Sequence, residues 1–472
     1  MNEKKPSKFN KVLNTGDVLV VAFGAMIGWG WVVSSGQWIQ NGGIVGTAIG
    51  FVIGGFMIFF VGLCYAELTA AMPKCGGEHV FSYKAFGPIG SFVCTWAIIL
   101  SYIGVVCYEA VSFPTILQYL FPGIMKKYLY TIGGFDIYLG WLIIAILMAA
   151  LILLLNITGT KKAAKFQKIL TGVIAMVGIF LVVGAFFNGD IKNVQAQSFV
   201  GEDMGSVVRN IIKVAIMTPF FFFGFDVIPQ AAEEIKMPLK KLGKTMIFSI
   251  ILAVSFYILI VISVGYIMSS SDILNSMDES GLVTADAMAK AFHSGNMAKV
   301  LIIGGLCGVI TSWNSFLIGG SRALYSMAAS SMLPHGFCTL HKKYNTPVNA
   351  LILVGVLSIV SPFFGKSMLV WVVDASNFAC CMAYCIVSTS FVVLRRKNPE
   401  MERPYRVKKY RLTGSIAIIM SGAMSLMYVI PNTNCTLIWQ EWIIVCGWSL
   451  LGVCLGGWSK QKYKKMFAEH IG

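Results

Sequence analysis

Long apolar stretches separated by short polar segments make up nearly the whole chain. A helix needs about 20 apolar residues to cross a hydrocarbon core about 30 Å thick. The pattern predicts twelve membrane spans, at residues 16–39, 44–71, 88–116, 137–158, 166–187, 207–234, 245–268, 297–327, 348–363, 368–394, 412–431 and 437–457. We therefore expect an all-α integral membrane protein with 12 transmembrane helices.

The composition agrees with this pattern. Of the 472 residues, 57% are hydrophobic and only 12% are charged, and the mean hydropathy of +0.75 is far above that of soluble domains. Twelve spans with their loops use almost the full length. We expect a single polytopic domain over residues 1–472, in the plasma membrane and in contact with the lipid bilayer, with no separate soluble domain.

The positive charge predicts the orientation of the chain in the membrane. Lys and Arg are retained on the cytoplasmic side of short loops. If the N-terminus is inside, most of the 37 basic residues fall in cytoplasmic segments, while the outer segments are rich in Asp and Glu. Residues 1–15 and 458–472 are thus predicted to be cytoplasmic. The net charge of +16 is explained by topology, and no nucleic-acid partner is expected.

The twelve cysteines lie almost entirely inside predicted spans, where they act as small apolar side chains. No disulfide framework is implied. Cys380, Cys381 and Cys385 are close in sequence, but no histidine or further thiolate stands at a matching spacing. We expect neither a metal site nor a cofactor.

Two predicted spans contain helix-breaking residues near their middle. These are "FGAMIGWGWV", residues 23–32, and "TPFFFFGFDVIP", residues 218–229. Non-helical backbone is tolerated inside a membrane only where protein or a cavity supplies hydrogen-bond partners. The interrupted segments are the first and sixth spans and so repeat after five, which predicts two inverted repeats at 16–190 (spans 1–5) and 207–394 (spans 6–10), followed by two extra spans within 412–457.

The breaks predict a ligand site. Glycine lets a ligand approach the backbone closely, and the start of the following half-helix offers N–H donors to a carboxylate. The two breaks together would hold a zwitterion. In the alternative interpretation these glycines only allow neighbouring helices to pack closely.

Five motifs in order resemble the amino acid, polyamine and organocation transporter superfamily, and most closely its amino acid permeases. They are "IGWG", "YAELTAAMPKCGGEHVF", "FFFFGFDVIPQAAEEIKMP", "NSFLIGGSRALYSMAASSMLP" and "LRRKNPEMERPYRV". The resemblance covers nearly the whole chain. It implies a five-plus-five inverted-repeat core, alternating access, and a substrate bound between the breaks of spans 1 and 6.

The resemblance also implies roles for individual residues. The carboxylate of a substrate would bind the backbone of Gly28, Trp29 and Gly30. Its ammonium would bind carbonyls near Ile27, Phe220 and Phe223, next to the break at Gly224, with Phe220 as an aromatic gate. This chain departs from the family at Trp29 and Trp31, which replace small or aliphatic residues. Many proton-coupled members also carry a lysine midway along span 5, where this chain has Ile174, with Lys168 the nearest lysine.

Polar residues inside spans are costly and often functional. Asp226 follows the break of span 6 and is interpreted as a proton site or coupling element, or as a cap of the half-helix. Glu67 is interpreted either as a coupling residue or as a partner of inner-loop lysines. Glu109 is a candidate for the substrate site or its vestibule, and Asn314 for the substrate pocket, a cation site or a helix-to-helix hydrogen bond.

The leading hypothesis is a secondary active transporter of an amino acid or close derivative, working by proton-coupled uptake or by exchange. The coupling ion would be a proton, with sodium as the alternative, and the protein a monomer or homodimer. An amine or polyamine carrier, or an amino acid/amine exchanger, is the second hypothesis, favoured by Glu109, Asp374 and the tryptophans. An enzyme is not expected, because no catalytic motif is present and His79 is predicted to lie in a loop after span 2.

Overall fold

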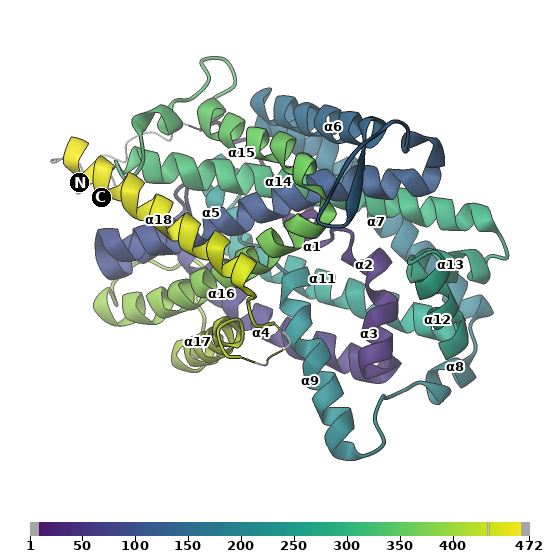
Figure 1. Ribbon diagram of the computed structural model, residues 1–472. Helices are drawn as coiled ribbons and strands as arrows, with labels where there is room; N and C mark the ends of the chain where they lie inside the picture. Colours follow the sequence, from purple (N-terminus) through teal and green to yellow (C-terminus); the bar gives the residue numbers. More distant parts are fainter. Residues whose placement is uncertain (1–8, 432, 434, 464–472) are drawn as a thin grey trace.

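The structure is a computed structural model that describes residues 9–431, 433 and 435–463 (Figure 1). It is a helical bundle with one short hairpin. The α-helices are Thr15–Met26 (α1), Gly30–Val33 (α2), Ser35–Gly42 (α3), Ile44–Ala71 (α4), Glu78–Leu120 (α5), Leu139–Ile157 (α6), Thr160–Asn188 (α7), Ile191–Ala196 (α8), Met204–Phe221 (α9), Val227–Gln230 (α10), Leu239–Ile267 (α11), Ser270–Glu279 (α12), Val283–Ala291 (α13), Gly295–Ala329 (α14), Val348–Val360 (α15), Gly365–Lys397 (α16), Tyr410–Met427 (α17) and Trp439–Lys462 (α18). The antiparallel strands are Tyr128–Ile132 (β1) and Phe135–Tyr138 (β2), and short 3-10 helices are Pro122–Ile124 (η1), Ala232–Glu234 (η2), His335–Cys338 (η3) and Ser361–Phe364 (η4).

Nine helices of the described residues are long and apolar enough to cross a membrane. Two shorter apolar helices, Thr15–Met26 and Val348–Phe364, accompany them. The predicted class, an all-α membrane protein, is confirmed. The count of twelve spans and the inverted repeat remain predictions.

The first predicted span is broken where the glycines stand. Helix α1 ends at Met26, Ile27 leaves helical geometry with φ −106° and ψ 81°, and α2 begins at Gly30. The short α3 then continues the chain to Gly42. The interruption frees backbone groups at Gly28 and Trp29 in the interior of the bundle.

The sixth predicted span is broken in the same way. Helix α9 ends at Phe221 and α10 begins at Val227. Between them Gly224 has φ +127°, a conformation that side chains disfavour. A Cβ at this position would lie 2.6 Å from the Cβ of Ala25 and 2.9 Å from its carbonyl carbon. The two breaks therefore touch, and only glycine permits this approach.

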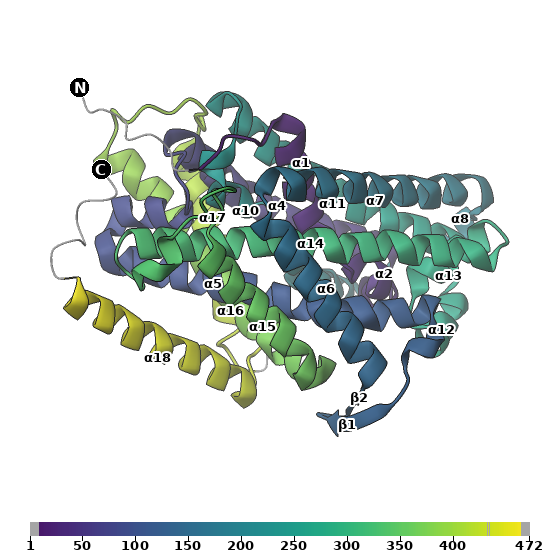
Figure 2. The ribbon, with the colours of Figure 1, turned by 90° about the horizontal axis from the view of Figure 1, so that it is seen from above.

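Helices α5, α14 and α16 form the centre of the bundle, and α18 lies along its outside (Figure 2). In the same view α8, α12 and α13 gather at one end of the long helices. Of the most apolar 18-residue segment of each helix, 89% is buried in α14 and only 11% in α18. The site is thus enclosed by α1, α5, α9, α14 and α16, and α18 contributes nothing to it.

The structure corrects two features expected from the sequence. The β1–β2 hairpin was not expected. Helical turns at residues 78–86 were not expected either: α5 begins at Glu78, after Gly76 and Gly77 with positive φ, and Gly87 (φ +78°) breaks it directly before the predicted span at 88–116. His79 therefore lies in the first turn of α5 and is 1% exposed, and its assignment to a loop was wrong.

Candidate functional site

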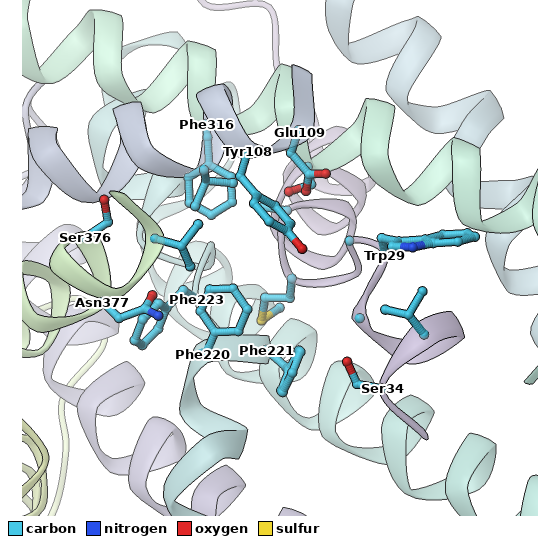
Figure 3. Close-up of a pocket in the computed structure, with 18 of the residues that line it drawn as sticks. Trp29, Ser34, Tyr108, Glu109, Phe220, Phe221, Phe223, Phe316, Ser376 and Asn377 are labelled. Atoms are coloured by element: carbon cyan, nitrogen blue, oxygen red, sulfur yellow. The ribbon is translucent and has the colours of Figure 1, made fainter. Parts of the chain in front are cut away.

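A cavity of about 140 Å³ lies between the two helix breaks. Its walls come from α1, α2, α5, α9, α11, α14 and α16 (Figure 3). Six of the predicted site residues line this cavity: Gly28, Trp29, Gly30, Glu109, Phe220 and Phe223. The structure thus brings together residues that lie almost two hundred positions apart in the sequence.

The wall from the first break offers hydrogen-bond donors. The N–H groups of Gly28 and Trp29 lie outside the helices and donate none of the hydrogen bonds found within the described part of the chain. The first N–H groups of a helix also have no partner inside it, which adds donors at the start of α2. Buried N–H groups without partners are costly, so this wall is suited to an anionic ligand group.

The shape of the first break depends on close packing by glycine. A Cβ at Gly308 of α14 would lie 2.6 Å from the carbonyl oxygen of Gly28 and 2.9 Å from that of Ile27. A Cβ at Gly30 would overlap the ring of Phe221 across the cavity. The backbone of α1 and α2 is therefore held against α14 on one side and α9 on the other.

The opposite break offers acceptors and aromatic surface. The carbonyls of Phe220 and Phe223 accept no backbone hydrogen bond from any described residue. The Phe220 ring packs edge-on against those of Phe221 and Phe223, with centroids 5.1 and 6.3 Å apart. Free carbonyls beside aromatic faces suit a positively charged ligand group.

Glu109 is the only charged residue among those that line the cavity. It is 4% exposed, its Oε2 has no hydrogen-bond partner among the described residues, and the Ser312 side chain lies beside its carboxylate. Its Oε1 lies 3.1 Å from the position of a Cβ on Gly28. Figure 3 shows this carboxylate and the Tyr108 ring on the wall of the cavity opposite Phe220 and Phe221.

Three of the predicted site residues are buried but do not line the cavity: Ile27, Gly224 and Asn314. Gly224 contacts Ala25 at the first break, and the Ile27 carbonyl packs against Gly308 of α14. Asn314 belongs to an amide chain, in which Asn156 Nδ2 donates to Asn314 Oδ1 (2.8 Å) and Asn314 Nδ2 donates to Gln167 Oε1 (2.7 Å). Its observed contacts join α6, α7 and α14.

The same amide chain occupies the interface between α1 and α14. Gln167 Nε2 donates to the Thr311 carbonyl (3.0 Å) and to Ser315 Oγ (2.8 Å). The hydroxyls of Thr311 and Ser315 in turn donate to the carbonyls of Gly24 (3.1 Å) and Val21 (3.2 Å). A neutral amide from α7 therefore stands among the carbonyls of α1 and the hydroxyls of α14, the kinds of group that would bind a sodium ion.

Asp226 lies beside the second break and away from the cavity lining. Its Oδ1 accepts from Tyr384 (2.9 Å) and from the Gly224 N–H (2.9 Å), and its Oδ2 accepts from Tyr102 (2.7 Å). It is 1% exposed. The carboxylate therefore holds the break in shape and links it to α5 and α16.

Two buried ion pairs lie beyond Asp226, toward the predicted cytoplasmic face. Arg322 Nε donates to Glu234 Oε1 (2.9 Å), and its Nη2 donates to Thr160 of α7 (2.9 Å). The Glu234 carbonyl accepts from Leu13 N (2.9 Å). We call the contact of Arg322, Glu234, Thr160 and Leu13 the inner clamp, because it ties the segment before α1 to α7, η2 and α14.

Glu67 forms the second pair, at the end of α4. Its Oε1 lies 2.7 Å from Arg395 Nε and 3.1 Å from Arg403 Nε, and its Oε2 accepts from Val407 N (2.7 Å). Its partners are arginines, where the sequence suggested lysines. This contact anchors the loop after α16, and a coupling role of Glu67 stays a prediction.

Several residues of the site and its surroundings were missed from the sequence. Tyr108, Phe316 and Asn377 line the cavity from α5, α14 and α16. Tyr108 precedes Glu109 in the sequence, and this neighbourhood was the available signal. The others lie on long apolar helices whose inward faces carry no distinctive pattern.

Comparison with known proteins agrees with this architecture. Residues 13–454 match the family described as "Amino acid permease". The methylthioribose transporter of Bacillus subtilis (strain 168) is 25% identical over 94% of this chain and 92% of its own length. The branched-chain amino acid permease BcaP of the same organism is 24% identical over 96% of this chain and 94% of its length. The aspartate-proton symporter of the same organism is 24% identical over 89% of this chain and 79% of its own length.

The match extends over both helix breaks, the cavity and the inner clamp. It includes all five motifs quoted from the sequence, and the relatives carry the names of transporters and permeases. The chain belongs to the amino acid permease family.

Proposed function

We propose that the protein is a secondary active transporter that moves an amino acid or close derivative across the plasma membrane by alternating access. The observation that carries this proposal is the cavity between the two breaks. It presents unpaired N–H groups on one wall and unpaired carbonyls on the other. Few ligands other than a zwitterion satisfy both walls at once.

The substrate would lie across the cavity. Its carboxylate accepts from the N–H groups of Gly28 and Trp29 and from the first turn of α2, where the helix dipole favours negative charge. Its ammonium donates to the carbonyls of Phe220 and Phe223. The side chain of the substrate then faces Phe316 and the end of the cavity near Asn377 (Figure 3).

Alternating access requires a barrier that opens on one side of the substrate at a time. The inner clamp is the barrier toward the cytoplasm, since it joins four segments through buried contacts. Its opening would separate α1 from α14 and release the substrate inward. The Phe220 ring would act as the gate on the cavity side.

A proton is the coupling ion that the contacts favour. The Gln167 amide donates to Ser315 Oγ and the Thr311 carbonyl, so a sodium ion at this place would have to displace a well-bonded amide. One relative is named an aspartate-proton symporter. Asp226 couples the second break to α5 and α16 and is the proposed coupling element.

An amino acid/amine exchanger is the second candidate, and Glu109 is the observation that favours it. A buried carboxylate with an unpartnered oxygen is suited to a second positive charge on a substrate. In that case the protein would exchange a cationic amino acid or amine for a related compound. The remaining contacts would be unchanged.

Thermal unfolding of the purified protein separates these functions, because a ligand that binds the folded state raises the Tm. The probes are the common amino acids, the primary amines that lack their carboxylates, and N-acetylated amino acids that lack the ammonium. The proposal predicts that only compounds with both groups raise the Tm. Equal shifts by amines alone would favour the second candidate, and no shift with any amino acid would contradict the proposed substrate class.

A further inference from the structure

A second buried acid lies outside the cavity and has no role in the transport steps proposed above. Glu78 stands in the first turn of α5 and is fully buried. Its Oε2 accepts from the Gln230 side-chain amide of α10. Its Oε1 has no hydrogen-bond partner among the described residues.

Glu78 and Asp226 differ in how well their surroundings stabilise a negative charge. Asp226 accepts three hydrogen bonds, from two tyrosine hydroxyls and a backbone N–H. Such a set of donors favours the ionised carboxylate. Glu78 accepts one side-chain hydrogen bond, from Gln230, with the Tyr65 hydroxyl and its own backbone nearby, and its Oε1 has no hydrogen-bond partner in the interior, where an unpaired charge is costly. If one of the two acids carries a proton, the contacts assign it to Glu78.

The two carboxylates interact with each other electrostatically. Neither forms an ion pair with any Lys or Arg of the described chain. Two like charges that share a dry site do not both ionise readily. The titratable and charged groups that face this pair are Tyr65 of α4, His79, Cys94 and Tyr102 of α5, and Cys380 and Tyr384 of α16.

His79 does not supply the missing positive partner. Its Nε2 is bonded to Ser330 Oγ (2.8 Å) and its Nδ1 to Ser91 Oγ (2.8 Å). Both ring nitrogens therefore bind hydroxyls that can serve a neutral imidazole. The pair of acids keeps a single negative charge when one proton is bound.

We propose that Glu78 is the residue that binds the transported proton, and that Asp226 remains ionised and acts as its electrostatic partner. This inference rests on the proposed proton-coupled transport and assigns the carrier within it. A proton from outside neutralises Glu78 in the closed conformation described here. The same proton leaves to the cytoplasm when the site opens inward, and the carboxylate is left charged in water.

The acid pair is connected to the substrate cavity through its tyrosines. The ring of Tyr102 packs on Phe316, with centroids 5.7 Å apart, and the ring of Tyr384 packs on Phe223 at 5.4 Å. Both phenylalanines line the cavity. A substrate that moves either ring would therefore move a donor to Asp226.

The acid pair is also connected to the inner barrier. The Gly76 N–H donates to the Gln230 carbonyl (3.2 Å), and Ser326 Oγ of α14 donates to the Cys75 carbonyl (3.2 Å). The loop before α5 thus lies between Glu78 and the helix that carries Arg322. Opening the inner clamp would shift this loop and admit water to Glu78.

Infrared difference spectroscopy of the full-length purified protein tests the assignment without requiring a known substrate. A protonated carboxyl in a dry site has a C=O stretching band separate from that of ionised carboxylates. Because Glu109 is also buried with an unpartnered oxygen, the spectra are recorded in a Glu109→Gln background, in which we expect this band near neutral pH, its loss on adding Glu78→Gln, and its persistence on adding Asp226→Asn. The exposed acid Glu202 on the outer loop provides the matched control, since Glu202→Gln should leave the band unchanged.

A transport arm uses proteoliposomes and a pool of labelled amino acids. Glu78→Gln should lose accumulation driven by a proton gradient but keep counterflow between preloaded and external amino acids. Glu78→Asp keeps a titratable group and should retain both the band and the accumulation. This variant shows whether a loss in Glu78→Gln comes from the missing carboxyl group or from misfolding. If neither the wild type nor any variant transports the pool, the result counts against the proposed function. The infrared spectra still test the assignment of the proton to Glu78 independently.

The assignment is overturned by an absent carboxyl band in the Glu109→Gln background. It is also overturned if the band remains in Glu78→Gln and disappears in Asp226→Asn, because the proton would then reside on Asp226. Gradient-driven accumulation by Glu78→Gln at the wild-type level would equally remove Glu78 from the coupling role.

Discussion

At the scale of single residues, glycine decides how closely the helix breaks approach their neighbours. Gly224 meets Ala25, and Gly308 meets the carbonyls of Gly28 and Ile27. These contacts are with backbone atoms, which cannot rotate away as a side chain can. The position of the N–H groups that face the cavity therefore depends on residues that do not touch the ligand.

The Gly308→Ala substitution tests this dependence. Its methyl group would lie 2.6 Å from the Gly28 carbonyl oxygen and push the first break toward the cavity. Overpacking costs about 1–3 kcal/mol of stability, and a displaced binding site lowers activity by up to about a hundredfold. We expect a lower Tm and uptake reduced by about tenfold or more. Gly172→Ala, where nothing lies within 4 Å, should behave as the wild type.

Under the second candidate function, exchange of a cationic amino acid or amine, Glu109 determines selectivity. Glu109→Gln keeps the size of the side chain but removes the only charge that lines the cavity. Loss of a buried charge pair costs about 2–5 kcal/mol, so we expect inhibition by amines and cationic amino acids to weaken by about thirtyfold or more. Inhibition by neutral amino acids should change little. A uniform loss for both classes would place Glu109 in a structural role instead.

At the scale of elements, the inner clamp holds together segments that must separate during transport. Arg322 is 1% exposed in its side chain and Glu234 is 4% exposed. Breaking a buried pair by removing one partner costs about 3–5 kcal/mol. The closed arrangement is therefore sensitive to a change at a single position on η2.

Glu234→Gln should populate the inward-open arrangement. Cys75, which is 8% exposed, donates to the Arg322 carbonyl and reports on this region. We expect faster alkylation of Cys75 by a maleimide in the variant, measured by mass spectrometry of its peptide. Glu400→Gln, at an exposed position after α16, provides the control. Unchanged alkylation of Cys75 in Glu234→Gln would show that the pair does not hold the barrier closed.

Elements with a strong apolar pattern could be predicted from the sequence. The predicted span 44–71 coincides with α4, and the breaks after Met26 and Phe221 stand where glycine and proline interrupt apolar runs. The helical turns of α5 before its break at Gly87 were not predicted, because they carry the polar residues Glu78 and His79. Their burial comes from contacts with α10 and α14, which local hydrophobicity does not encode.

Partners across the bundle could not be predicted. Asn314 was a candidate for the substrate pocket, a cation site or a helix-to-helix hydrogen bond, because it is a polar residue inside a span. Its bonds to Asn156 and Gln167 join residues about 150 positions apart, and a single sequence does not encode such pairs. The N–H groups of Gly28 and Trp29 were predictable, since a break in a span frees them wherever the helices pack.

At the scale of the whole molecule, the cavity, the acid pair and the inner clamp lie in succession from the helix breaks toward the predicted cytoplasmic face. Aromatic contacts join the cavity to Asp226, and the loop before α5 joins Glu78 to α14. A substrate and a proton can therefore favour the same conformational change. This arrangement predicts that uptake increases as the external pH falls, measured as initial rates at fixed internal pH. A flat pH profile would separate transport from proton binding.

The central claim is that this chain uses a proton gradient to move an amino acid. Its most direct test is uptake of a pool of labelled amino acids into proteoliposomes under an inward proton gradient, with and without a protonophore. We expect one zwitterionic compound or a related group to accumulate, and the protonophore to abolish the accumulation. Transport that is unaffected by the protonophore, or no transport of any member of the pool, would contradict the account.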